Sequence, residues 1–216
     1  MPVTTTHQFI DLYPVRNTDT RMIVGTIHPH NHAGFLIPFF YGNVGSFWDI
    51  LNHAFPRHNL VSRENIITML RDNNVWITDI IRQCDRENER VTQDSLLNNI
   101  TFNTDQIRQA LLDSQINTIY FTSRFGKNNA AKLFTHVFNI NYRQTFNPQT
   151  NEFIIPHNLF GREIRCIVLY SPSNDANRGI SRSVAYRNNR QRYEHLPTPV
   201  KQFKIDFYKD KFQFLT

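Results

Sequence analysis

The architecture of this chain can be anticipated from residues 22–48, which have the sequence MIVGTIHPHNHAGFLIPFFYGNVGSFW. A short, β-branched apolar run ends at Gly25 and predicts a buried strand over residues 21–25. A loop with histidines at alternate positions and an aromatic cluster follow, and a helix capped by Ser46 is expected over residues 46–55. Loops that leave a rigid strand commonly carry binding residues, so we expect this loop to line a site.

Apolar runs of the same type recur along the chain. Three of them predict further strands, over residues 75–81, 117–122 and 165–170. Amphipathic segments predict helices over residues 62–71, 104–113, 128–138, 179–193 and 200–212. The charged residues 82–94 show no periodicity and are expected to form a loop.

Strands that alternate with helices indicate an α/β fold, here a three-layer α/β/α sandwich with a mostly parallel four-stranded central sheet. A length of 216 residues and a hydrophobic content of 40% predict a single domain over residues 1–216. Residues 140–161 are expected to form an insertion, a hairpin or excursion at the sheet edge. Ligands of such sheets bind at the carboxyl ends of the strands, where loops 26–45, 79–94 and 171–179 are expected to meet.

The composition limits which partner and which cellular compartment are expected. The net charge of +6 and a pI near 9.5 favour a polyanionic partner, and nucleic acid is favoured over a membrane surface. Two cysteines, Cys84 and Cys166, cannot build a disulfide framework or a four-cysteine cluster, which indicates a reduced, cytoplasmic protein. The N-terminal residues lack the features of a signal peptide, and no apolar run approaches the ~20 residues that span a membrane. We therefore expect a soluble protein.

The histidine loop has two interpretations. His28, His30 and His32 resemble the His-x-His that opens metal-dependent amidohydrolases, where imidazoles bind zinc. Those barrels need about 250 residues and further ligands at later strand ends. The alternative is that the histidines lie at the surface of a polar loop and one of them lines a pocket.

Other polar and aromatic residues also allow two interpretations. Phe40 and Tyr41 either pack in the core or provide a stacking platform for a planar ligand, and Asn43 is suited to contact a base edge. Asp79 ends an apolar strand as either a cap or a catalytic acid. A loop of small residues and two arginines suits phosphate contact but is also typical of a solvated turn; its residues are Ser171, Pro172, Ser173, Asn174, Arg178 and Arg182.

Taken together, these segments resemble the uracil-DNA glycosylase superfamily, and most of all its hypoxanthine-DNA glycosylase branch. Four motifs in the family's order, between about residues 22 and 195, carry the resemblance. They are VGT at 24–26 with Pro29, FYGN at 40–43 with Phe47 and Trp48, the run from Trp76 through DIIRQCDRE at 79–87, and LYSPS at 169–173.

The resemblance implies a monofunctional enzyme that hydrolyses the N-glycosidic bond of a base flipped out of DNA, without a metal or organic cofactor or an obligatory protein partner. It implies catalytic roles for Asp79, Asn43 and His28, with Asp79 positioning water and stabilising the sugar cation. Base contacts are implied for Tyr41, Phe40, Thr26 and His30. The segment from Ser171 to Arg182 would hold the DNA phosphates of a monomeric protein.

The chain also departs from the family pattern. His28 is inserted before Pro29, His30 replaces a glycine, and residues 44–46 replace a Pro-x-Asn segment. The excised base could therefore be uracil, hypoxanthine or a modified cytosine such as a phage DNA base. The biological role could be repair or defence against foreign DNA. A DNA-binding protein that lacks the chemistry and a metal-dependent hydrolase that uses the three histidines are the alternatives.

Overall fold

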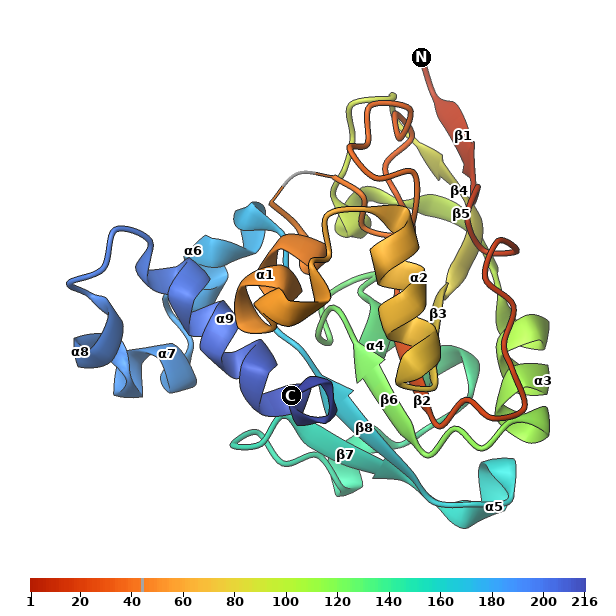
Figure 1. The fold of residues 1–216 in the computed structure, drawn as a ribbon. Helices are drawn as coiled ribbons and strands as arrows, with labels where there is room; N and C mark the ends of the chain where they lie inside the picture. The colour runs from red at the N-terminus through yellow and green to blue at the C-terminus, as the bar shows by residue number, and fades with distance from the viewer. Residues whose placement is uncertain (44) are drawn as a thin grey trace. The chain divides into compact units, whose positions relative to one another are not determined.

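The computed structural model describes residues 1–43 and 45–216 and shows an α/β protein (Figure 1). Val44, in the segment that departs from the family's second motif, lies outside the described residues. The chain divides into two compact units. Unit 1 comprises Met1–Gly34 and Asn74–Leu169, and unit 2 comprises Phe35–Asn73 and Tyr170–Thr216. The single domain over residues 1–216 stays a prediction.

The main sheet of unit 1 has five strands in the order β3 (Val75–Asp79), β2 (Arg21–Gly25), β6 (Thr118–Phe121), β8 (Ile164–Val168) and β7 (Glu152–Ile155). The first four are parallel and confirm the strands predicted from the apolar runs (Figure 1). The fifth, β7, pairs antiparallel with β8 and lies within the predicted insertion. The predicted four-stranded sheet is thus corrected to five strands, because the insertion adds an edge strand.

Burial explains why these strands could be recognised. Every residue of β3 is buried, as are four of the five in β2 and in β8. Strands that are covered on both faces have near-continuous apolar sequences, which is the pattern that predicted them. The helices of unit 1 are α3 (Thr104–Asp113), α4 (Ala130–Val137) and the short α5 (His157–Phe160).

A second, three-stranded antiparallel sheet was not predicted. Its order is β1 (Val3–Thr6), β4 (Ile81–Arg86) and β5 (Asn98–Phe102). The predicted strand 75–81 ends at Asp79, and the predicted loop 82–94 is wrong, since β4 occupies its first half. Strand β4 was missed because one of its inward side chains is the buried Arg86.

Unit 2 is helical. Its helices are α1 (Phe47–Ala54), α2 (Arg63–Asp72), α6 (Asn177–Ile180), α7 (Val184–Asn188), α8 (Arg190–Tyr193) and α9 (Pro199–Lys211). The single basic helix predicted over 179–193 is wrong, because Ser183 caps a new helix by accepting a hydrogen bond from the amide of Tyr186. The described residues of both units also contain five single-turn 3₁₀ segments. They are Pro56–His58, Asp94–Leu96, Tyr142–Gln144, Asn174–Ala176 and Gln213–Leu215.

The predicted helix caps had different outcomes. Ser62 caps α2 as expected, since its hydroxyl accepts from the amide of Asn65 at 3.2 Å. Ser46 precedes α1 but its hydroxyl donates to the carbonyl of Tyr41 at 2.6 Å instead of capping the helix. That bond fixes the chain in the aromatic cluster of the second motif.

Aromatic side chains form the interior of unit 2. One cluster joins Tyr170, Ile180, Tyr186, Tyr193 and Phe203. Across the described residues, no helix combines the length and apolar character that crossing a membrane requires.

Candidate active site

The candidate active site lies in unit 1, where β2 and β3 end side by side. Gly25 and Asp79 are partners in the parallel register, so both strands present their carboxyl ends at the same edge of the sheet. The amide of Ile80 donates to the carbonyl of Gly25 at 3.0 Å and joins the two strand ends. Ligand sites of parallel sheets form at such edges.

Asp79 is buried and paired with a histidine that the sequence did not point to. The carboxylate Oδ2 lies 2.7 Å from Nε2 of His7, and the two residues are 4% and 7% exposed. The other ring nitrogen of His7, Nδ1, accepts from the amides of Phe9 and Ile10 at 3.1 Å each. Nε2 therefore carries the hydrogen, and a neutral imidazole donates to Asp79. Asp79 thus accepts a buried hydrogen bond from His7.

Strand β1 brings His7 to this position. β1 pairs with β4, and the amide of His7 continues the pairing by donating to the carbonyl of Arg82 at 2.8 Å. The signal in the sequence was a β-branched run, VTTT at 3–6, that ends one residue before the histidine. His7 reaches the carboxylate only because β1 pairs with β4, whose paired residues are 77 to 83 positions away in the sequence. Local sequence pattern does not reveal such pairing.

His28, predicted as catalytic, is buried and neutral. Its Nε2 accepts from the amide of Gln8 at 3.0 Å, so Nδ1 carries the hydrogen and donates to the carbonyl of Pro29 at 2.7 Å. Burial lowers the pKa of His28 to about 4, the Pro29 carbonyl opposes this, and His7 and His32 add to it. Both ring nitrogens of His28 are therefore engaged, and the ring is uncharged at neutral pH.

The rings beside the carboxylate form one cluster with edge-to-face and tilted contacts. The His28 ring lies 4.8 Å from that of His7 and 4.3 Å from that of His32, measured between centroids. Phe9 closes the group at 5.1 Å from His28. The histidine loop is therefore packed against the chain that follows β1 and is not a free surface loop.

The metal interpretation of the three histidines finds no geometric support. His30 Nδ1 lies 3.1 Å from the Thr5 hydroxyl, and both nitrogens of His28 bond to backbone. Within residues 1–43 and 45–216, no group of three or more His, Cys, Asp or Glu side chains is arranged to hold a metal ion.

A buried arginine, Arg86, holds the histidine loop in place. Arg86 is 1% exposed, and its guanidinium donates to the Thr5 hydroxyl at 3.1 Å, the His28 carbonyl at 2.9 Å and the Val91 carbonyl at 2.7 Å. These three bonds satisfy a charge that would be costly to bury without partners. Arg86 thereby joins β1, β4 and the histidine loop.

A second carboxyl group, Asp94, lies in the same site. The Thr26 hydroxyl donates to its Oδ2 at 2.9 Å, so Thr26 contacts a carboxyl group within the protein. Burial raises the pKa of Asp94 to about 6, the Thr26 bond and Arg86 oppose the rise, and the charge of Asp79 adds to it. Two nearby carboxyls whose environments differ are the usual arrangement for separate acid and base roles.

Phe40, predicted to contact a base, lies in unit 2 and is 1% exposed. Its ring packs edge-on against Phe39 with 5.1 Å between centroids, and its carbonyl accepts from the Trp48 indole at 2.5 Å. Phe40 therefore serves packing.

Tyr41 and Asn43 are more accessible. Tyr41 is half-buried, has a φ of +54°, and packs its ring 5.1 Å from that of Phe47. A positive φ at a bulky residue is strained and marks a position that the surrounding chain holds in place. Gly42 is required next to it, since a Cβ there would lie 1.6 Å from the carbonyl oxygen of Ile37. Asn43 is exposed.

The predicted phosphate-contact loop also belongs to unit 2. Pro172 is buried, Ser171 is half-buried, and the exposed residues are Ser173, Asn174, Arg178 and Arg182. The carbonyls of Pro172 and Ser173 accept from Lys204 at 3.0 and 3.3 Å, which fixes the loop backbone. The polar side chains and both arginines thus face solvent on a supported loop.

No protein-family model matches the chain, and no curated protein matches its sequence.

Proposed function

We propose that the protein is a DNA glycosylase that hydrolyses the N-glycosidic bond of a damaged or modified base after the base has left the duplex. The observation that carries the proposal is the buried Asp79 carboxylate at the carboxyl end of β3, held by the neutral His7 at 2.7 Å. The parallel order β3, β2, β6, β8 supports the resemblance to the uracil-DNA glycosylase superfamily, and we extend the proposal to its three-layer α/β/α arrangement.

Asp79 is the proposed catalytic residue for this hydrolysis. As the C1′–N bond breaks, its electron pair leaves with the base and positive charge develops on the sugar. A fixed carboxylate stabilises that charge and orients a water molecule, whose oxygen bonds to C1′. The water gives up a proton as it adds, and the departing base takes up one, so the reaction needs no cofactor. His7 acts by positioning Asp79, since its N–H keeps the carboxylate in place.

DNA contact is assigned to unit 2. Its exposed Ser173, Asn174, Arg178 and Arg182 suit phosphate oxygens, and the net charge of +6 favours a polyanion. Tyr41 and Asn43 are the proposed base contacts, because they are more accessible than Phe40. We propose further that the protein works as a monomer in the cytoplasm.

One observation favours a second candidate function, a DNA-binding protein without the chemistry. Asp79 is only 4% exposed and already bonds to His7, which is also how a purely structural carboxylate would lie. The two candidates differ in whether any base is released.

The test uses oligonucleotides that carry uracil, hypoxanthine, hydroxymethylcytosine or glucosylated hydroxymethylcytosine. After incubation, alkali cleaves the abasic sites, and strand breaks are counted. We expect breaks on one substrate, their loss in Asp79→Asn, and full activity in the control Asp105→Asn, which changes an exposed aspartate of the same unit. DNA binding without breaks on any substrate would establish the second candidate instead.

A further inference from the structure

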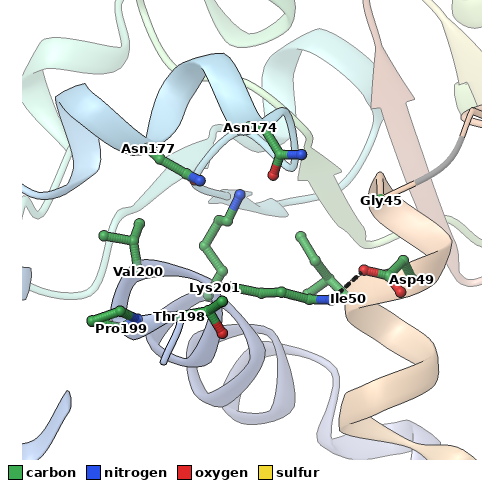
Figure 2. Close-up of a pocket in the computed structure, with 10 residues that line it drawn as sticks. Gly45, Asp49, Ile50, Asn174, Asn177, Thr198, Pro199, Val200 and Lys201 are labelled. Atoms are coloured by element: carbon green, nitrogen blue, oxygen red, sulfur yellow. Dashed lines mark ion pairs between the residues drawn. The ribbon is translucent and has the colours of Figure 1, made fainter. Parts of the chain in front are cut away.

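Unit 2 contains a pocket that shares only Asn174 with the roles proposed above (Figure 2). It encloses about 420 Å³, within the range of small-molecule sites. The polar residues that line it are Asp49, Asn174, Asn177, Thr198, Lys201 and Lys204. Asp49 comes from α1, Asn174 from the 3₁₀ segment 174–176 and Asn177 from the start of α6. Thr198 directly precedes α9, and Lys201 and Lys204 lie in its first two turns.

A buried lysine gives the pocket its charge. Lys204 is 1% exposed, and its ammonium donates to two neutral acceptors, the carbonyls of Pro172 and Ser173. An ammonium group has three N–H donors, so these bonds leave one more to satisfy. Burial lowers the pKa of Lys204 to about 8, Lys201 adds to this, and Asp49 opposes it.

The one carboxylate of the pocket lining is already paired. Oδ2 of Asp49 lies 2.8 Å from Nζ of Lys201, and Figure 2 marks this ion pair. The Lys201–Asp49 pair is neutral overall, so the charge of Lys204 is left in excess. A buried charge without a counter-ion is unfavourable, and an anion in the pocket would remove that cost.

The asparagines supply further hydrogen-bonding groups. Oδ1 of Asn177 is buried, and no group of residues 1–43 or 45–216 donates to it. Because the oxygen and nitrogen of an amide can exchange places by a flip, this position offers a donor as readily as an acceptor. In Figure 2 the side chains of Asn174 and Asn177 lie together on one side of the pocket, across from Lys201 and Thr198.

We propose that this pocket binds a phosphate group. The oxygens of a phosphate accept several hydrogen bonds at once, which suits the ammonium of Lys204, the amides of Asn174 and Asn177 and the hydroxyl of Thr198. The inference is independent of the hydrolysis assigned to Asp79, because every residue of the pocket belongs to unit 2. The phosphate belongs either to a free nucleotide or to a DNA strand, and the chemistry that binds it is the same.

The test measures binding to the full chain by calorimetry, with inorganic phosphate, a nucleoside 5′-monophosphate and a short single-stranded oligonucleotide as separate probes. We expect saturable binding that weakens at least tenfold in Lys204→Met. Because loss of a buried lysine can unfold a protein, Asn177→Leu is the second variant, with the same weakening expected. Lys209→Met is the control, since it removes an exposed charge from the same helix.

The outcomes separate the two sources of phosphate. Tight binding of the monophosphate, without competition from the oligonucleotide, identifies a free nucleotide. Competition between the oligonucleotide and inorganic phosphate identifies the DNA backbone. The proposal fails if none of the three probes binds saturably, or if Asn177→Leu and Lys209→Met bind every probe as tightly as the parent protein. Base release by Asp79 is measured separately and does not depend on either result.

Discussion

At the residue scale, the His7–Asp79 hydrogen bond is the contact whose removal should be most costly. In His7→Ala a buried carboxylate loses a donor, which costs about 3 kcal/mol of the free energy of unfolding at neutral pH. Urea denaturation measures the loss. His136→Ala removes an exposed histidine of the same unit and should stay within about 0.5 kcal/mol of the parent. Equal stability of the two variants would show that the bond contributes nothing.

Asp94 leads to a prediction about pH. Its pKa is raised from 3.8 to about 6, so between these values the unfolded chain ionises first and the native state loses stability as pH rises. Asp94→Asn removes that loss. The stability of the variant relative to the parent should therefore increase by roughly 1–3 kcal/mol between pH 4 and pH 7. Urea unfolding at the two pH values measures it, and a difference that does not change with pH contradicts the assignment.

His28 leads to the opposite dependence. Its pKa is lowered from 6.5 to about 4, so the unfolded chain takes up the proton first as pH falls, and stability decreases between these values. An NMR titration of the ring protons should place the His28 midpoint near pH 4 and identify the Nδ1–H tautomer. A midpoint near 6.5 would mean that the ring is not held as described.

The sequence indicated Asp79, Thr26 and the histidine loop, but not how they are joined. Asp79 could be found because it ends an apolar run, which is a local signal. His7 could not, since its role depends on β1 pairing with β4. Nor could the Thr26–Asp94 bond, which joins residues 68 positions apart. The sequence thus predicted the position of Asp79 at a strand end, whereas only the tertiary structure identified His7 as its partner.

At the element scale, Arg86 links two strands and a loop. Arg86→Leu removes three hydrogen bonds, two of them to β1 and to the histidine loop. We expect β1 to open locally, so that amide hydrogen exchange at Val3–Thr6 accelerates while exchange in β6 is unchanged. Arg90→Leu, at an exposed position, is the control. Uniform acceleration in every strand would indicate global destabilisation instead.

Elements with continuous apolar or strongly amphipathic sequence were predicted correctly. β2, β6 and β8 are of this kind, as are α2 and α3. Strand β4 was missed because its buried side chains include an arginine, and β1 because it consists mainly of threonine. The segment after residue 179 looked like one helix, but side-chain hydrogen bonds divide it. Periodicity identifies elements that apolar burial stabilises, and it fails where polar side chains are buried.

At the scale of the whole molecule, net charge is the property that can be read directly from the sequence. The α/β class and a net charge of +6 follow from pattern and composition, whereas the division into two units does not. Composition gives total charge, but only the structure shows which arginines are free of carboxylates. Arg190 and Arg192 pair with Glu194 and Asp206, so they are weaker candidates for phosphate contact than their sequence position suggests.

Arg178 and Arg182 lead to the prediction about DNA affinity. Both are exposed on the segment proposed to contact phosphates, and each phosphate contact releases counterions. The slope of log K against log salt concentration should therefore decrease by about 1 in Arg178→Ala, and by a similar amount in Arg182→Ala. Fluorescence anisotropy with a labelled duplex from low to moderate salt measures it.

The matched control is Arg165→Ala. Arg165 is also exposed, but it pairs with Glu152 at 2.9 Å on the sheet of unit 1. Arg165→Ala should leave the slope unchanged, because the charge of Arg165 is already compensated and the residue lies outside the proposed DNA-contact segment. Equal slopes for Arg165→Ala and Arg178→Ala would mean that binding follows net charge alone. A smaller slope only for Arg178→Ala and Arg182→Ala assigns phosphate contact to these residues, whether or not a base is released.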